Sequence, residues 1–154
     1  MRELNIGGST VPAIGLGTWH MGDSASTRAD EIKAIQDGIA AGARVIDTAE
    51  MYGNGRSERL VGEAIKDMQR DDLFIIDKVL PSNASASRME HSLDTSLKLV
   101  GTDYFDLYLY HWRGAVPLSE TIATLQQLQQ KGKIKHWGVS NFDISDMEEL
   151  MDLP

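Results

Sequence analysis

Short apolar segments that are typical of buried strands alternate along this chain with segments of helical periodicity. The apolar segments are rich in β-branched, aliphatic and aromatic residues, as in strands that are buried on both faces of a sheet. They are AIGLGT (13–18), RVIDTA (44–49), LFIIDKV (73–79), FDLYLYHW (105–112) and KIKHWGVS (133–140). Because strands that alternate with helices form right-handed crossovers, the sequence predicts an α/β domain with a parallel sheet.

The segments between these predicted strands carry apolar residues at the spacing of amphipathic helices. Ser57 precedes one of them and is its predicted N-cap. Three helical segments end at a glycine that can adopt the left-handed conformation of a C-cap, namely Gly42, Gly101 and Gly132.

Ahead of the first of these strands, Gly7 and Gly8 separate two short apolar runs and predict a β-hairpin over about residues 1–12. The rest of the chain, about residues 13–154, then divides into five βα units. We expect the hairpin and these units to form a single domain over residues 1–154.

A polar residue stands at the C-terminal end of four predicted strands, at intervals of about 30 residues: Asp47, Lys78, His111 and Ser140. In a parallel α/β barrel the C-terminal strand ends build the active site, so these side chains should meet on one rim. An open doubly wound sheet requires a Gly-rich phosphate turn that opens the first helix, whereas GLGTWHMGD leads into a polar loop. The sequence therefore favours a barrel of the (β/α)8 TIM type.

These residue types suggest proton donation to a carbonyl group. A free phenol has a pKa of about 10, so a tyrosine donates efficiently at neutral pH only where a nearby cation stabilises the phenolate. Lys78 is the candidate cation for Tyr52, Asp47 could hold the lysine, and His111 could bind a substrate oxygen. Because no side chain supplies a hydride, reduction also requires a nicotinamide or flavin cofactor.

Each of these residues also has a structural interpretation. Taken singly, Asp47 could cap a turn and His111 could be a core histidine, while Trp19 and Trp112 could serve packing alone. Lys78 is harder to explain structurally, because a lysine among apolar strand residues is rarely buried without a partner.

Five stretches of the chain match the motifs of one known family, in the same order. They are VPAIGLGTW (11–19), VIDTAEMYGNGRSERLVGEAI (45–65), DKVLPSNAS (77–85), SLDTSLKLVGTDYFDLYLYHW (92–112) and KGKIKHWGVSNF (131–142). Through these motifs the chain resembles the aldo/keto reductase family. The resemblance implies a (β/α)8 barrel that binds NADP(H) in an extended form and reduces an aldehyde or ketone to an alcohol. It also implies a catalytic tetrad of Asp47, Tyr52, Lys78 and His111, with the tyrosine as general acid.

The same resemblance implies further contacts with cofactor and substrate. Trp19 and Trp112 would wall the pocket of a small carbonyl substrate. The implied cofactor-binding residues are Gly17, Thr18 and Trp19 at the mouth, Asp47, and Ser140 with Asn141 at the nicotinamide carboxamide.

The chain departs from the family pattern at Asp77, which strand alternation directs away from Lys78 toward the helix layer. A carboxylate there needs hydrogen-bond donors, and the backbone amides around Ser85–Ser87 are the candidates.

A second departure is length, because five βα units fall short of the eight in a complete barrel. We expect a barrel truncated after the fifth unit, as a truncated form of an active reductase. The alternatives are a partial barrel completed by another chain and a non-catalytic, barrel-derived binding or regulatory module. Both alternatives predict self-association through exposed strand edges.

Composition argues against several other classes of protein. A net charge of −8, with 23 acidic and 15 basic residues and no basic cluster, disfavours nucleic-acid binding. The sequence has no cysteine, no apolar run of the roughly 20 residues needed to span a membrane and no signal segment, so a cytoplasmic protein is expected. The other three histidines, His20, His91 and His136, lack metal-ligand spacing, so no metal site is expected.

Overall fold

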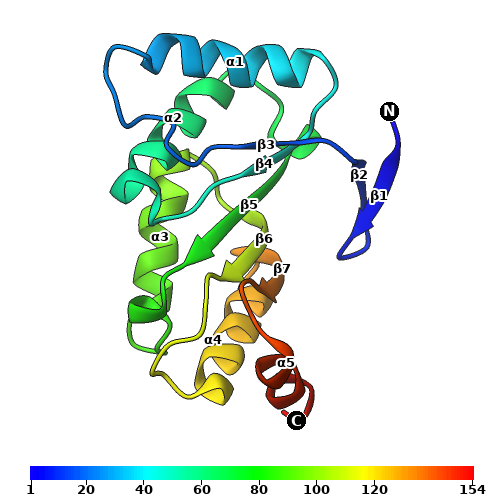
Figure 1. Ribbon diagram of the computed structural model, residues 1–154, viewed down its shortest axis with the longest axis vertical. Coiled ribbons are helices and arrows are strands. Elements are labelled where there is room, and N and C mark those ends of the chain that lie inside the picture. The colour runs from blue at the N-terminus through cyan, green and yellow to red at the C-terminus, as the bar shows by residue number, and fades with distance from the viewer.

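The computed structural model describes residues 1–154 and contains a five-stranded parallel sheet with helices packed on one face (Figure 1). The strands are β3 (Gly15–Gly17), β4 (Val45–Asp47), β5 (Phe74–Val79), β6 (Phe105–Tyr110) and β7 (Ile134–Val139), and they pair in chain order. Sequential parallel pairing is the topology of a barrel wall, whereas a doubly wound sheet reverses its strand order. The predicted α/β class is confirmed.

Helices follow the strands as the apolar periodicity predicts. The α-helices are α1 (Arg28–Ala40), α2 (Arg56–Ile65), α3 (Met89–Val100), α4 (Leu118–Gln130) and α5 (Ile144–Met151). Short 3-10 helices occur at η1 (Tyr52–Gly55), η2 (Arg70–Asp72) and η3 (Pro81–Asn83). No helix combines the length and the apolar character needed to cross a membrane.

The predicted hairpin is present as the antiparallel pair β1 (Glu3–Ile6) and β2 (Ser9–Pro12). Gly7 and Gly8 form its turn with positive φ angles of 57° and 89°, a backbone conformation that glycine adopts without steric cost. The hairpin lies at the end of the sheet where the strands begin (Figure 1), and Val11 packs there against strand residues Val45 and Phe74.

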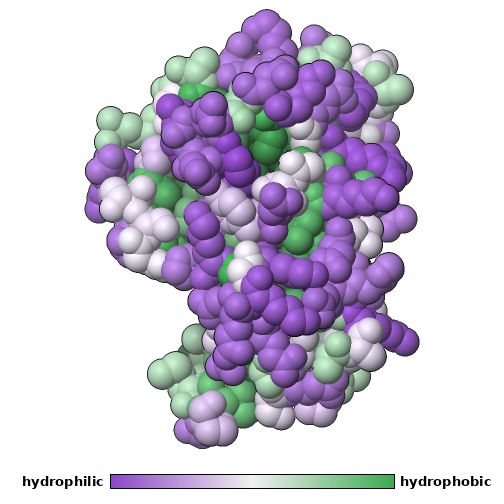
Figure 2. All heavy atoms as spheres, turned by 180° about the vertical axis from the view of Figure 1, so that it is seen from behind, coloured by the Kyte–Doolittle hydropathy of each residue, from purple (hydrophilic) through white to green (hydrophobic).

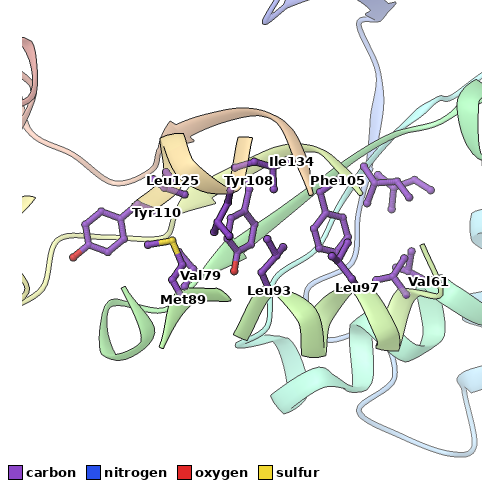
Figure 3. Close-up of a cluster of buried hydrophobic side chains, with 14 of the residues drawn as sticks. Val61, Val79, Met89, Leu93, Leu97, Phe105, Tyr108, Tyr110, Leu125 and Ile134 are labelled. Atoms are coloured by element: carbon purple, nitrogen blue, oxygen red, sulfur yellow. The ribbon is translucent and has the colours of Figure 1, made fainter. Parts of the chain in front are cut away.

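The main hydrophobic core lies between the sheet and the helices. In β5, Ile75 and Val79 are fully buried on the helix-facing side, in a cluster of 22 buried apolar residues, whereas the cluster beneath the hairpin has only 3. Figure 3 shows Leu93 and Leu97 of α3 in this core beside aromatic residues of β6. Burial of this face, at about 25 cal/mol per Å² of apolar surface, holds the helices against the sheet.

The opposite face of the sheet is less completely covered. Leu107 and Leu109 on β6 are only half-buried, and β3 and β7 form the two open edges. Helix α5 lies at the lower end of the molecule (Figure 1), where Figure 2 shows a hydrophobic patch. On α5, Ile144 and Met151 are 80% and 77% accessible. Open edges of parallel strands can pair with other chains, so self-association stays a prediction.

The predictions for the helix ends were partly right. Gly42, Gly101 and Gly132 all have positive φ, as predicted. The N-cap prediction for Ser57 was wrong, because α2 begins at Arg56 with Gly55 at the N-cap position. The Ser57 hydroxyl instead lies 3.0 Å from the carbonyl oxygen of Thr18, where it joins the loop after β3 to α2.

Asp77 points toward the helix layer as predicted. The prediction that backbone amides around Ser85–Ser87 donate to its carboxylate was wrong. Its Oδ1 accepts the Lys78 backbone N–H at 2.8 Å, and its neighbour is Glu58 of α2. Burial and the adjacent Glu58 raise the pKa of Asp77 well above its usual range, and burial also raises the pKa of Glu58. Asp77 Oδ2 and Glu58 Oε1 are buried without a donor, and a proton on one of the two carboxyl groups can supply the missing hydrogen bond.

At the other end of the sheet, Arg70 ties together the starts of two strands. Its guanidinium lies 2.7 Å from Asp106 Oδ2, donates to the Tyr104 carbonyl oxygen at 2.9 Å and lies 4.1 Å from the Tyr104 ring centroid. The same Asp106 oxygen accepts the Ile75 N–H at 2.9 Å. Because this face of a barrel is remote from the C-terminal strand ends, we assign the Arg70 cluster to stability.

Replacing Arg70 with methionine should lower the free energy of unfolding by about 3 kcal/mol, since it leaves the buried Asp106 carboxylate without its main cation. We take the lower end of the range for a broken buried pair because Lys135 stays 3.6 Å from Asp106 Oδ1. Urea denaturation would measure the loss. The matched control is Arg28→Met, which removes the partner of the exposed Glu63 and should cost about 0–1 kcal/mol. Equal losses in both variants would contradict the assignment.

The free energy of unfolding of the Asp77→Asn variant, relative to that of the wild type, should increase as the pH rises. A carboxyl group with a raised folded-state pKa contributes stability below its unfolded pKa of about 4 and loses it as the pH rises through the folded value. Asparagine cannot ionise, and it can still accept from Lys78 N–H and donate to Glu58. Urea denaturation of both proteins between about pH 4 and pH 8 would measure this difference. A pH-independent difference would exclude ionisation of Asp77 as the cause.

Candidate active site

The four predicted tetrad residues come together at the end of the sheet where the strands finish. Asp47 is the last residue of β4, Lys78 is the next-to-last residue of β5, and His111 directly follows β6. Tyr52 opens η1 in the turn after β4. Because β4, β5 and β6 are adjacent parallel strands, their C-terminal ends place these side chains on one edge.

Lys78 connects the other polar groups of this site. Its Nζ lies 2.8 Å from Asp47 Oδ1, 2.9 Å from the Thr48 carbonyl oxygen and 3.1 Å from the Tyr52 hydroxyl. These neighbours can accept all three ammonium hydrogens, which allows a lysine that is only 6% accessible to remain charged. The arrangement places a cation directly beside the phenolic oxygen.

His111 stands edge-on to Tyr52, with 6.0 Å between the ring centroids and 79° between the ring planes. Burial lowers the pKa of His111, and the nearby charge of Lys78 lowers it further, so the imidazole is neutral at pH 7. Its Nδ1 is buried without a hydrogen-bond partner. The single N–H of the neutral ring is therefore better placed on Nε2, where it can donate to a substrate oxygen.

Thr18 lies behind the site rather than in its mouth. It is fully buried, and its hydroxyl donates to the Asp47 carbonyl oxygen at 2.9 Å. Ser57 Oγ lies 2.6 Å from Thr18 Oγ1 and 3.1 Å from Thr48 Oγ1. These three hydroxyls join the loop after β3 to the turn that carries Tyr52. The buried Thr18 side chain therefore supports the mouth of the site by fixing these segments and does not line it.

The two predicted pocket tryptophans form an aromatic rim. Trp19 is 65% accessible, its ring centroid lies 6.4 Å from that of Tyr52, and it stacks on His20 at 4.4 Å. Trp112 is 36% accessible and lies 4.6 Å from the His111 ring. Beside Trp19, Gly17 has open space where a side chain would project. The rim therefore offers apolar surface on both sides of the polar groups.

Ser140 and Asn141 follow β7 and present polar atoms that suit a primary carboxamide. Asn141 Nδ2 donates to the His111 carbonyl oxygen at 2.9 Å and to Ser140 Oγ at 3.1 Å. These bonds leave Asn141 Oδ1 as an acceptor and the Ser140 hydroxyl hydrogen as a donor, matching the NH2 and C=O groups of a carboxamide. Asn141 has a φ of 57°, a left-handed conformation that asparagine tolerates.

Sequence reasoning assigned no role to Glu50, although it lies two residues before Tyr52. Its Oε1 accepts the Leu80 N–H at 2.6 Å and Asn83 Nδ2 at 3.0 Å, and its Oε2 accepts the Ser92 hydroxyl. The sequence shows an acidic residue in the turn, but only the folded chain shows which donors surround it.

A surface hollow of about 590 Å³ lies along α5, where Phe142, Ile144 and Met147 line it, and it does not coincide with these groups. We therefore identify the candidate active site from the contacts of Lys78 and not from cavity size.

Known proteins resemble this chain in sequence and in overall structure. Residues 13–153 match the model of the aldo/keto reductase family. Methylglyoxal reductase YeaE of Escherichia coli is 46% identical over 148 residues, which make up 96% of this chain and 52% of that protein. Aldo-keto reductase YhdN of Bacillus subtilis is 38% identical, with coverage of 96% of this chain and 49% of that protein.

A solved structure of an aldo-keto reductase from Klebsiella pneumoniae in complex with NADPH superposes with a TM-score of 0.92 at 46% identity. The match covers 95% of this chain and 51% of that one, so the chain spans about half the length of such relatives. The predicted barrel-type fold with an N-terminal hairpin is confirmed. With a family match over nearly all of its residues, a shared strand order and a close structural likeness, this chain belongs to the aldo/keto reductase family.

Proposed function

We propose that these residues form the proton-donating side of an active site that reduces an aldehyde or ketone to an alcohol with NADP(H). The observation that carries the proposal is the chain of contacts from Asp47 through Lys78 to Tyr52, at 2.8 Å and 3.1 Å. The Escherichia coli relative is named a methylglyoxal reductase, so a small 2-oxoaldehyde is the first substrate class to test.

In the proposed reaction, Tyr52 is the general acid. Its hydroxyl gives a proton to the carbonyl oxygen of the substrate, and the Lys78 ammonium at 3.1 Å stabilises the negative charge that remains on the phenolic oxygen. Asp47 holds Lys78 in place and balances its charge. A neutral His111 donates a hydrogen bond from Nε2 to the same carbonyl oxygen and thereby orients it.

The cofactor proposal rests on the family and on the atoms that the chain presents. When bound, NADPH supplies the hydride that completes the reduction. Ser140 and Asn141 would hold its carboxamide through the hydroxyl donor and Oδ1 acceptor left open in the structure. Gly17 leaves room for a ligand to approach the backbone closely, and Trp19 and Trp112 would limit the substrate pocket.

The proposal applies to the barrel as a whole, because the chain spans about half the length of its relatives. Residues 1–154 supply the four polar groups as one structural unit. A suitable assay protein is a chimera that joins residues 1–154 to the remainder of the Escherichia coli relative beyond the matched region, tested beside the 154-residue chain alone.

In the chimera, Tyr52→Phe should lower kcat for methylglyoxal by about 10² to 10⁴, because the phenol supplies the proton. Steady-state NADPH oxidation would measure kcat, and fluorescence titration should show unchanged NADPH affinity. Tyr104→Phe is the matched control, since it removes a hydroxyl that donates to Asp71 near the other end of the sheet. Full activity in the Tyr52 variant would remove Tyr52 from the mechanism.

The pKa of His111 should lie below the ordinary value for histidine. Lys78→Met should raise the pKa of His111, but not as far as the ordinary value. The substitution removes the nearby positive charge that opposes protonation, but the larger effect of burial remains. Histidine NMR resonances of the chimera, followed from about pH 4 to pH 8, would show both midpoints. An unchanged midpoint in the lysine variant would mean that Lys78 does not act on His111.

A further inference from the structure

Glu50 lies at the point where the turn after β4 meets the loop after β5. The pairing of these strands continues into the turn, since Thr48 N–H donates to the Ile76 carbonyl oxygen at 2.9 Å and Glu50 N–H lies 3.4 Å from the Lys78 carbonyl oxygen. Tyr52 begins η1 two residues later, and its N–H donates to the Ala49 carbonyl oxygen. Glu50 is thus the last residue of the turn to contact β5 before the chain reaches Tyr52.

The Glu50 side chain joins three parts of the fold. Its carboxylate accepts the Leu80 N–H and Asn83 Nδ2 from the loop after β5, and the Ser92 hydroxyl from α3. No cation pairs with it, so three neutral donors satisfy a half-buried carboxylate. Hydrogen bonds to an ionised acceptor are shorter and stronger than neutral ones, and this set holds the two loops firmly.

Apart from the backbone pairing of β4 with β5, few polar contacts link the segments that carry Tyr52 and Lys78. Between residues 45–55 and residues 76–92, every side-chain hydrogen bond or ion pair is made either by Lys78 Nζ or by the Glu50 carboxylate. The contacts of Lys78 are those that the proposed reaction uses. Beyond the backbone pairing, the Glu50 contacts are therefore the side-chain support for the 3.1 Å separation between Lys78 Nζ and Tyr52 that does not involve Lys78 Nζ itself.

We infer that Glu50 is a positioning residue, which holds the turn that carries Tyr52 against the loop after β5 and so aligns the phenol with the Lys78 ammonium. This inference rests on the proposed function for its effect on rate. Proton donation requires close alignment, and a displacement of about 1 Å at the reacting groups can lower the rate by 10²-fold. Glu50 itself makes no hydrogen bond to the Tyr52 phenol, because its oxygens accept from Leu80, Asn83 and Ser92.

Two substitutions separate positioning from simple loss of charge. Glu50→Ala removes all three hydrogen bonds. Glu50→Gln keeps an oxygen for Leu80 and Asn83, and its NH2 group can donate to the Ser92 hydroxyl, which accepts as readily as it donates. Alanine should therefore release the turn, whereas glutamine should largely preserve it.

In the chimera, Glu50→Ala should lower kcat for methylglyoxal by 10-fold to about 10²-fold, with KM and NADPH affinity nearly unchanged. Glu50→Gln should restore most of kcat. The control is Glu63→Ala on α2, an exposed glutamate that pairs with Arg28 and should leave kcat unchanged. Wild-type kcat in the alanine variant would overturn the inference, as would a glutamine variant that remains folded and is as slow as the alanine variant.

A second readout does not depend on catalysis. With 3-fluorotyrosine at the four tyrosines, ¹⁹F NMR of the 154-residue chain and the chimera should give a Tyr52 resonance, assigned with Tyr52→Phe. Glu50→Ala should shift or broaden this resonance and leave that of Tyr104 unchanged. If Glu50→Ala alters the Tyr52 resonance but the chimera has no reductase activity, the proposed function is refuted and the positioning role is not. Reductase activity with an unaltered Tyr52 resonance in the alanine variant would refute the positioning role alone.

Discussion

The buried ammonium group of Lys78 is the feature on which the candidate site depends. A charge that is almost fully removed from water must be compensated, and here Asp47, the Thr48 carbonyl oxygen and the Tyr52 hydroxyl surround it. Satisfying this one charge brings the end of β4, the following turn and the end of β5 together. The same ammonium group places positive charge beside the Tyr52 phenol and His111. Lys78 therefore both holds these segments together and supplies the cation that the proposed proton donation requires.

The two faces of β5 are used for different purposes. Lys78 points to the inner side of the sheet, and its neighbour Asp77 points to the helix layer, where it is fully buried beside Glu58. Glu50 adds a third carboxyl group in the turn after β4, where it has neutral donors and no cation. Of these acidic side chains, only Asp47 pairs with the Lys78 ammonium group, whereas Asp77 accepts the Lys78 backbone N–H from the helix side of the sheet.

Much of this arrangement could be predicted from the sequence. Strand alternation correctly directed Asp77 away from Lys78, and the regular spacing of strand ends predicted that Asp47, Lys78 and His111 would meet on one edge. The errors concern local partners. Ser57 looked like a helix cap, but its hydroxyl lies against Thr18. The donors expected for Asp77 in the next loop are replaced by the Lys78 N–H, and its carboxyl group lies beside Glu58.

Periodicity and residue type determined the class of fold, the order of the strands and the edge on which the polar residues gather, because these follow from local backbone geometry and from which side chains avoid water. Only the tertiary structure decided the partners of Glu50, Glu58 and Ser57 and the buried position of Thr18. Those contacts join residues from different βα units. Their distances depend on how helices and loops pack, and no local pattern in the chain records that packing.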